Sequence, residues 1–224
     1  MKEYQTDKIR NIALVSHSSA GKTMLAEAFL HTTGVTTRLG RIEDGSTASD
    51  FEEEENRRGI SLSTTVIPIE HKDHKINFLD TPGYTDFVGE VISAMRVADS
   101  AVVVVDSVAG AEVGTEIAWT YADEFNLPRF VVINKMDRDN ADFQKALGTV
   151  ATIAETRLIP VQLPWGEKEE FKGVLDLLSM QAYAGEGKSG EEIPAEFSDA
   201  VEEARMELVE AAAEGDDELL MKYL

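Results

Sequence analysis

The stretch Ser16-His17-Ser18-Ser19-Ala20-Gly21-Lys22-Thr23 decides the fold, because it stands between a short apolar run and a helical pattern. Residues 12–15 predict a buried strand, and Leu25 and Phe29 recur at helical spacing. A loop between a strand and a helix can wrap phosphate oxygens with its backbone N–H groups, at the positive end of the helix. Ser16 stands where the G-x-x-x-x-G-K-[ST] pattern has glycine, so an ordinary strand-to-helix turn is the alternative.

The side chains of this loop indicate the chemistry that it serves. Lys22 is placed to contact the β and γ phosphates of a nucleoside triphosphate, and the Thr23 hydroxyl is placed to ligate Mg²⁺. Backbone groups of the preceding residues complete the phosphate cradle. The predicted nucleotide-binding residues of the loop are Ser18, Ser19, Ala20, Gly21, Lys22 and Thr23.

A second motif, Asp80-Thr81-Pro82-Gly83, directly follows the apolar run at residues 76–79. Asp80 is therefore expected at the end of a strand, where its carboxylate holds Mg²⁺ through water. The Gly83 N–H is expected to contact a γ-phosphate. Both residues join the predicted nucleotide site.

A third motif, Asn134-Lys135-Met136-Asp137, follows the apolar run at residues 130–133. The Asp137 carboxylate can accept hydrogen bonds from both the N1–H and the exocyclic amine of guanine, which adenine does not offer. Asn134, Lys135 and Asp137 are therefore predicted to bind the base, and the nucleotide is predicted to be GTP or GDP. Each of the three motifs is short, but together, in this order and at three strand ends, they strongly indicate a guanine-nucleotide site.

The segments between the motifs predict a doubly wound α/β fold with a mostly parallel sheet. Residues 101–106 are uniformly apolar and β-branched up to Asp106, which is typical of a parallel strand covered on both faces. Residues 66–69 and 75–79 flank a turn and predict an antiparallel pair, with Pro68 at the sheet edge. Helical patterns alternate with these strands, as in α/β folds that bind nucleotides at strand ends.

These motifs, together with further segments, resemble elongation factor G. The resemblance covers nearly the whole chain, and its last two segments resemble the insert that this factor has among translational GTPases. It implies a P-loop GTPase fold whose GTP-binding core spans residues 1–157. The segment 158–224 is then the first part of a small α+β insert subdomain. The segments that carry the resemblance are Arg57-Arg58-Gly59-Ile60-Ser61, residues 80–87, the NKMD motif, residues 159–164 and residues 171–174.

The resemblance also implies roles for residues outside the phosphate loop. Residues 32–59 become the first switch segment, which the γ-phosphate and Mg²⁺ order. Ser61 takes the place of the threonine that closes this segment on Mg²⁺, and it keeps the hydroxyl. The predicted metal ligands are therefore Thr23, Ser61 and Asp80.

Two departures from elongation factor G concern hydrolysis. Tyr84 stands where the family has a histidine, and Ser19 stands where it has an aspartate. A phenol can position a water molecule, but it cannot carry the imidazolium charge, so we expect slow intrinsic hydrolysis that depends on a partner. The predicted catalytic residues are Tyr84, Lys22 and Gly83. Two functions stay open: a GTPase that acts on the ribosome, and a GTP-gated regulatory binding module with weak or no hydrolysis.

The sequence contains no match, after Asn134, to the Ser-Ala-Lys-like loop that contacts the guanine oxygen in such GTPases. Elongation factor G carries this loop beyond its insert. The resemblance therefore implies a C-terminally incomplete fragment of a longer protein, without the last strand and helix of the sheet.

Composition bounds the partners and the location. The 224 residues include 42 acidic and 21 basic side chains, for a net charge of −21. This charge argues against DNA and anionic membranes as partners, and contact with ribosomal RNA must then be local. The chain has no cysteine, which excludes disulfides and thiolate metal sites. No apolar run approaches membrane-spanning length, so we expect a cytoplasmic monomer.

Overall fold

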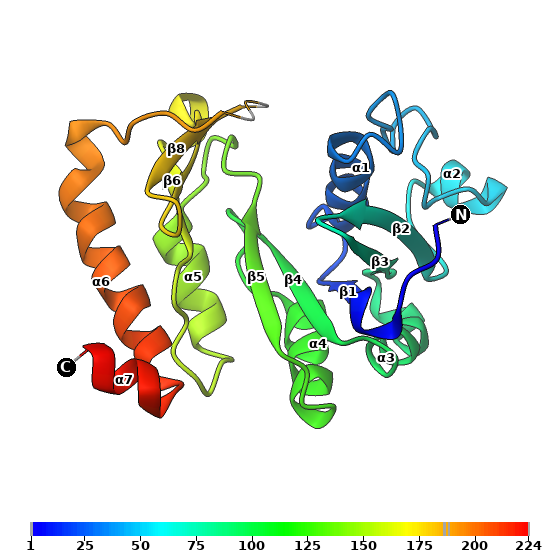
Figure 1. Ribbon diagram of the computed structural model, residues 1–224. Coiled ribbons are helices and arrows are strands. Elements are labelled where there is room, and N and C mark those ends of the chain that lie inside the picture. Colours follow the sequence, from blue (N-terminus) through cyan, green and yellow to red (C-terminus); the bar gives the residue numbers. More distant parts are fainter. Residues whose placement is uncertain (1, 186, 188, 224) are drawn as a thin grey trace. The chain divides into compact units, whose positions relative to one another are not determined.

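The computed structural model describes residues 2–185, 187 and 189–223, and it divides into two compact units between Asn134 and Lys135. The first unit is an α/β structure in which strands and helices alternate along the chain (Figure 1). Its strands are β1 (Ile9–Val15), β2 (Thr65–His71), β3 (His74–Asp80), β4 (Ser100–Asp106) and β5 (Arg129–Asn134). Its helices are α1 (Lys22–Thr32), α2 (Glu53–Arg58), α3 (Val88–Met95) and α4 (Val113–Glu124), with short 3₁₀ turns at Thr6–Lys8 and Thr85–Phe87.

The strands of this unit form one mixed sheet in the order β2-β3-β1-β4-β5. β1, β3, β4 and β5 are parallel, and only β2 runs antiparallel, beside β3. The expected doubly wound, mostly parallel sheet is therefore confirmed. Parallel strands end at the same edge, which brings the segments after β1 and β3, and the last residue of β5, to one side of the unit.

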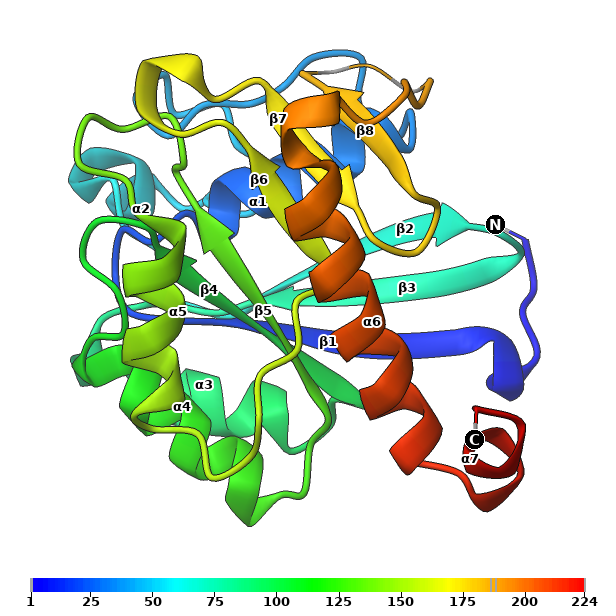
Figure 2. The same ribbon diagram turned by 90° about the vertical axis from the view of Figure 1, so that its left-hand side faces the viewer.

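Helices cover both faces of this sheet. Leu14 packs with Leu30 of α1 and with Phe78 of β3 in one buried cluster, so it points to the α1 face. Side chains alternate along a strand, so the fully buried Ala13 and Val15 point to the opposite face. Figures 1 and 2 show α1 on one side of the sheet and α3 and α4 on the other. Coverage of both faces explains why residues 101–105 are continuously apolar.

The antiparallel pair at the sheet edge follows the sequence closely. β2 and β3 pair from Thr65 with Asp80 to His71 with His74. The two residues between the strands, Lys72 and Asp73, have positive φ angles of 44° and 60°. This is the backbone of a two-residue hairpin turn whose twist matches that of the strands. Pro68 lies on β2, the edge strand, as predicted.

The segment between α1 and β2 contains a short helix that its sequence did not indicate. α2 covers part of the acidic run, which has no apolar period. The Glu52 and Glu55 side chains form a capping box at its first turn, and Glu54 pairs with Arg57 and Arg58 one turn later. Local side-chain bonds therefore stabilise α2 in place of an apolar face.

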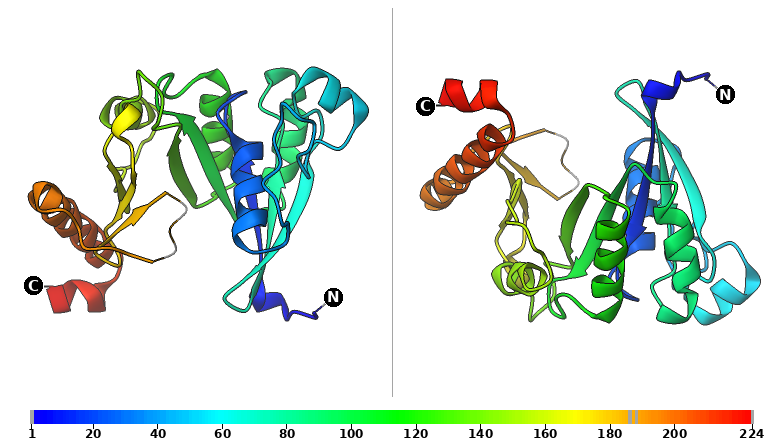
Figure 3. Two further views of the ribbon diagram at one scale, coloured as in Figure 1. Left: turned by 90° about the horizontal axis from the view of Figure 1, so that it is seen from above. Right: turned by 90° about the horizontal axis from the view of Figure 1, so that it is seen from below.

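The second unit holds a three-stranded antiparallel sheet, in the order β6-β7-β8, and a long helix. Leu175 and Leu177 form its buried core with Val201 of the helix, and Ala204 and Leu208 pack against them. Figure 3 shows this helix, α6, lying along the small sheet. Its elements are α5 (Phe143–Ala151), β6 (Gln162–Trp165), β7 (Gly173–Asp176), β8 (Gln181–Ala184), α6 (Ser198–Glu214) and α7 (Asp217–Tyr223), with 3₁₀ turns at Lys168–Glu170 and Ala195–Phe197.

The division between the two units, after Asn134, reflects the compactness of the structure. The expected boundary between a GTP-binding core at residues 1–157 and an insert at 158–224 concerns function, and it stays a prediction. Across the described residues, no helix is both long and apolar enough to cross a membrane.

Candidate nucleotide and magnesium site

The loop between β1 and α1 bends through two residues with left-handed backbone. Ser19 has a φ angle of 62°, and Gly21, which precedes α1, has a φ angle of 105°. Loops of this kind form concave nests of N–H groups that bind anions. The predicted phosphate-binding residues Ser18, Ser19, Ala20 and Gly21 therefore lie together before the N-terminus of an 11-residue helix.

Lys22 is the buried cation of this loop, with only 6% of its surface exposed. Its Nζ donates to Ser16 Oγ at 3.0 Å and to the His17 carbonyl at 3.2 Å. Burial lowers the pKa of Lys22 to about 8, although Asp80 and Asp50 oppose this shift. Ser16, which the sequence showed only as a departure from glycine, thus holds the lysine in the loop.

Two hydroxyls and two carboxylates gather next to Lys22. Thr23 Oγ1 donates to Asp80 Oδ2 at 2.9 Å and lies 3.4 Å from Ser61 Oγ. Ser61 Oγ in turn donates to Asp50 Oδ1 at 2.7 Å. The structure therefore brings together all three predicted metal ligands, from α1, the end of β3 and the segment before β2. It adds Asp50, which the sequence analysis missed.

Asp80 is almost completely buried, and burial raises its pKa to about 6, against the opposing effects of Lys22 and Thr23. Its second oxygen, Oδ1, has no hydrogen-bond partner in the described part of the chain. The nearby Ser49 hydroxyl lowers this pKa but does not reach hydrogen-bond geometry. A buried carboxylate oxygen without a partner is a costly arrangement, which a bound cation or water would relieve.

These residues fit Mg²⁺. All four side chains offer oxygen atoms, which Mg²⁺ prefers, and two carboxylates leave room for waters and phosphate oxygens. No group of three or more His, Cys, Asp or Glu side chains among the described residues is placed to share a metal ion.

The turn after β3 lies directly on the phosphate loop. Thr81 Oγ1 donates to the Leu14 carbonyl at 2.7 Å and fastens this turn to β1. A Cβ added to Gly83 would fall 2.6 Å from both Lys22 Nζ and Ser18 Cα. Only glycine fits this close approach to Lys22 and Ser18, and the predicted contact of the Gly83 N–H with a γ-phosphate stays a prediction.

Tyr84, the predicted water-positioning residue, follows Gly83 and precedes the 3₁₀ turn at Thr85–Phe87. Its side chain is 42% exposed, so the ring is not part of the core. An accessible phenol next to Gly83 is compatible with a role at the nucleotide. The roles of Tyr84, Lys22 and Gly83 in hydrolysis stay predictions.

His17 ties the phosphate loop to the start of α4. The Gly114 N–H donates to His17 Nδ1 at 3.2 Å, so the ring proton resides on Nε2, which lies 3.7 Å from Glu112 Oε1. A Cβ on Gly114 would fall 2.7 Å from His17 Cα. Because these residues lie 97 positions apart, spacing along the sequence gave no sign of this contact.

Asn134, the first residue of the NKMD motif, contacts the phosphate loop within the first unit. Its Nδ2 donates to the Ala20 carbonyl at 2.9 Å. Lys135, with a φ angle of 62°, and Asp137, whose side chain is exposed, follow in the second unit. The structure thus brings Asn134 to the phosphate loop, and guanine recognition by Lys135 and Asp137 stays a prediction.

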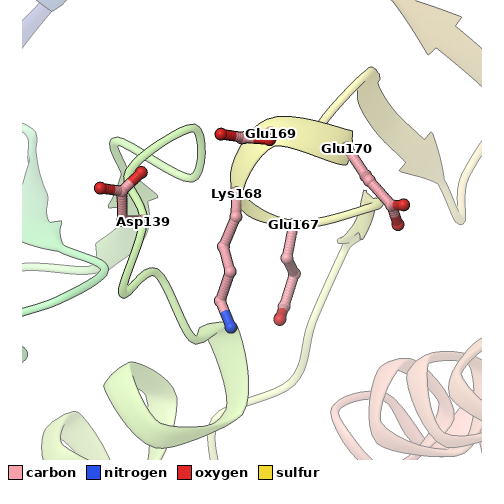
Figure 4. Close-up of a pocket in the computed structure, with 5 residues that line it drawn as sticks. All are labelled: Asp139, Glu167, Lys168, Glu169 and Glu170. Atoms are coloured by element: carbon pink, nitrogen blue, oxygen red, sulfur yellow. The ribbon is translucent and has the colours of Figure 1, made fainter.

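Within the second unit, a turn of the small sheet supports this motif. The Lys168 N–H donates to the Met136 carbonyl at 2.9 Å, and Glu167 Oε1 accepts from the Phe143 N–H at 3.3 Å. A Cβ on Gly166 would fall 2.2 Å from the Glu170 carbonyl oxygen, so this turn has a fixed shape. Figure 4 shows the side chains that line an open pocket of about 360 Å³ here, namely Asp139, Glu167, Lys168, Glu169 and Glu170.

Comparison with known proteins identifies the family and the fold of this chain. The family described as Elongation factor Tu GTP binding domain matches residues 7–216. A crystal structure of a protein from Thermus thermophilus is similar to this chain, with a TM-score of 0.89 and 39% sequence identity. The match covers 96% of this chain and 33% of that one, so this chain spans about a third of its length. The predicted resemblance to a translational GTPase and the P-loop GTPase fold are confirmed.

Proposed function

Because the chain belongs to the family of elongation factor Tu GTP-binding domains, the G domains of translational GTPases, we propose that it hydrolyses GTP on the ribosome. In this proposal it is the GTP-binding part of an elongation factor G-like translation factor. One observation carries the proposal: Thr23, Ser61, Asp80 and Asp50 meet beside Lys22 and form an oxygen-rich site next to a phosphate loop.

The chain's residues divide the work of phosphoryl transfer to water. Lys22 Nζ and the N–H groups of the phosphate loop hold the phosphate oxygens, and the Gly83 N–H contacts the γ-phosphate. Thr23, Ser61 and Asp80 would hold Mg²⁺. When bound, Mg²⁺ neutralises charge on the β and γ phosphates. Tyr84 orients the attacking water, and in this proposal no side chain forms a covalent bond to the phosphoryl group.

Guanine recognition completes the proposal. Asp137 accepts hydrogen bonds from the base, while Asn134 braces the phosphate loop through Ala20. Residues 1–157 act as the GTP-binding core, and residues 158–224 begin the insert. The proposal also includes contact with the ribosome, by resemblance to elongation factor G, together with a cytoplasmic location and a monomeric state.

A GTP-gated binding module without useful hydrolysis is the second candidate. Tyr84 favours it, because a phenol replaces the histidine expected at this place in elongation factor G. In this reading GTP orders the segment before β2 and creates a surface for a partner, and hydrolysis is incidental.

Single-turnover GTP hydrolysis by the full-length protein, with and without ribosomes, separates the two functions. We expect a slow rate alone and a rate at least about 100-fold higher with saturating ribosomes, because a partner fixes the water-positioning group. A Lys22→Ala variant should lose both rates. An unchanged rate at saturating ribosomes would contradict the GTPase proposal and favour the binding module.

A further inference from the structure

Glu27 is a buried acidic residue that the proposed phosphoryl transfer does not use. It lies on α1, four residues after Thr23, and only 1% of its surface is exposed. Its Oε2 accepts from the Gly40 N–H at 3.0 Å, and its Oε1 accepts from the Ala48 N–H at 2.5 Å. Both of these partners are backbone groups of the segment between α1 and β2. One carboxylate therefore bonds two ends of an irregular loop.

The approach of this loop to Glu27 leaves no spare room. A Cβ on Gly40 would fall 2.5 Å from Glu27 Oε2 and 2.6 Å from the Ser46 carbonyl oxygen. Between its two bonded ends the loop makes a tight turn, in which the Ser46 N–H donates to the Arg41 carbonyl at 3.1 Å. The chain is therefore shaped to bring its backbone up to this carboxylate.

Three consecutive residues of this loop are each bonded to a different part of the chain. Glu27 of α1 holds the Ala48 N–H. Thr65, the first residue of β2, donates from Oγ1 to the Ser49 carbonyl at 2.9 Å. Asp50 then accepts from Ser61 Oγ at 2.7 Å. The position of Asp50, and through it that of the Ser61 hydroxyl, is thus fixed by the bonds on Ala48 and Ser49.

We infer that Glu27 is a positioning residue that sets the Mg²⁺-binding geometry of Ser61 by anchoring residues 40–50 to the helix that carries Thr23. This inference rests on the proposed GTP site. In this inference Glu27 acts through Ala48 and Asp50 rather than by direct contact with the nucleotide or the ion. A rigid helix turn links Thr23 to Glu27, so the two halves of the metal site share one support.

Glu27→Gln keeps the volume of the side chain but turns one of the two acceptors into a donor that faces an N–H group. Gly40→Ala leaves the carboxylate intact and displaces the loop from it. In the full-length protein, both variants should raise the Mg²⁺ concentration for half-maximal binding of a non-hydrolysable GTP analogue about tenfold, the usual effect of losing a hydrogen bond to a charged group. GDP binding should change less than about twofold, because GDP lacks the γ-phosphate that orders this segment.

Trypsin gives a readout that needs no nucleotide. Arg41 is exposed in the anchored segment and Arg38 is exposed just before it, so both variants should speed cleavage at these two arginines about tenfold relative to the wild type. Glu43→Gln is the matched control, because Glu43 is a carboxylate of the same segment that lies outside these contacts. It should leave Mg²⁺ dependence and cleavage unchanged.

Equal weakening of GTP-analogue and GDP binding would overturn the inference, since a residue needed only for folding would affect both. Unchanged Mg²⁺ dependence in both variants would overturn it as well. Wild-type protein that binds neither nucleotide would contradict the proposed function instead. Trypsin cleavage would still show in that case whether Glu27 anchors the segment.

Discussion

Thr23 Oγ1 lies 3.4 Å from Ser61 Oγ, although the two residues are 38 positions apart in the chain. Thr23 lies in the first turn of α1, and Ser61 belongs to the segment before β2. Each hydroxyl also bonds a buried carboxylate, Thr23 to Asp80 and Ser61 to Asp50. The pair is thus a small polar centre, and its two halves come from parts of the chain that a nucleotide would join.

Ser61→Ala should weaken Mg²⁺-dependent GTP binding about tenfold and lower the free energy of unfolding by about 1–3 kcal/mol, because it leaves the buried Asp50 carboxylate without its donor. Ser61→Thr should retain both properties, since it keeps the hydroxyl. Thermal unfolding and Mg²⁺ titration check these outcomes. Ser63→Ala, at an exposed hydroxyl two residues away, is the control. Equal behaviour of Ser61→Ala and Ser63→Ala would show that the Ser61 hydroxyl has no such role.

Asp80 predicts a pH dependence of stability in the nucleotide-free protein. Folding raises its pKa from 3.8 to about 6, so the folded state binds this proton more tightly than the unfolded chain. The protonated Asp80 carboxyl therefore stabilises the folded state relative to the ionised one. This contribution to the free energy of unfolding is fully present below about pH 4 and is lost as the pH rises to about 6. Asp80→Asn should therefore raise the free energy of unfolding at pH 7, on the order of 2 kcal/mol, and abolish Mg²⁺-dependent nucleotide binding.

Chemical denaturation of both proteins at pH 4 and pH 7 checks this prediction. The gain from Asp80→Asn should shrink towards zero at pH 4, where the wild-type carboxyl is itself protonated. A variant that is less stable than the wild type at pH 7 would show that burial does not strain this carboxylate. Such an exchange of stability for function is common at binding sites.

Gly83→Ala should impair binding of a GTP analogue by about tenfold or more. Its Cβ would fall 2.6 Å from both Lys22 Nζ and Ser18 Cα, so the turn must move off the phosphate loop. Gly89→Ala is a matched control, because a Cβ there meets nothing within 4 Å and Gly89 lies inside α3. That control should leave binding unchanged and slightly stabilise the helix. Unaltered analogue binding by Gly83→Ala would remove Gly83 from the proposed site.

Tyr84 is the residue proposed to position the water that attacks GTP. Tyr84→His should raise the single-turnover GTP hydrolysis rate about tenfold or more, because an imidazolium can stabilise charge that a phenol cannot. Tyr84→Phe should lower the rate, since it removes the hydroxyl that positions water. Rapid-quench measurements with ribosomes present check both. A Tyr84→Phe variant as fast as the wild type would mean that the phenol has no part in the reaction.

The sequence predicted those parts of the fold that local pattern determines. The phosphate loop, the hairpin after β2 and the strand at residues 101–106 each depend on neighbouring residues, and the structure has them where expected. α2 was missed because capping and ion pairs, not an apolar stripe, stabilise it. β8 was missed because Gln181–Ala184 is short and buries only Ala182 deeply.

The candidate site was predictable only in part, because local motifs reveal some of its residues while contacts between distant residues place the others. Asp80, Thr23 and Ser61 stand in motifs, so the chain reveals them one by one. Asp50 and Glu27 stand in no motif, and each gains its place through partners 11 to 21 positions away. Their burial next to backbone donors and hydroxyls becomes visible only when the loop is folded.

The most direct test of the account is nucleotide titration of the full-length protein, with and without Mg²⁺. We expect GTP and GDP to bind with Mg²⁺ at least about 100-fold more tightly than ATP, because two hydrogen bonds to Asp137 distinguish the bases. Asp137→Asn should shift the preference towards xanthosine triphosphate. ATP binding as tight as GTP binding, or no nucleotide binding at all, would contradict the account.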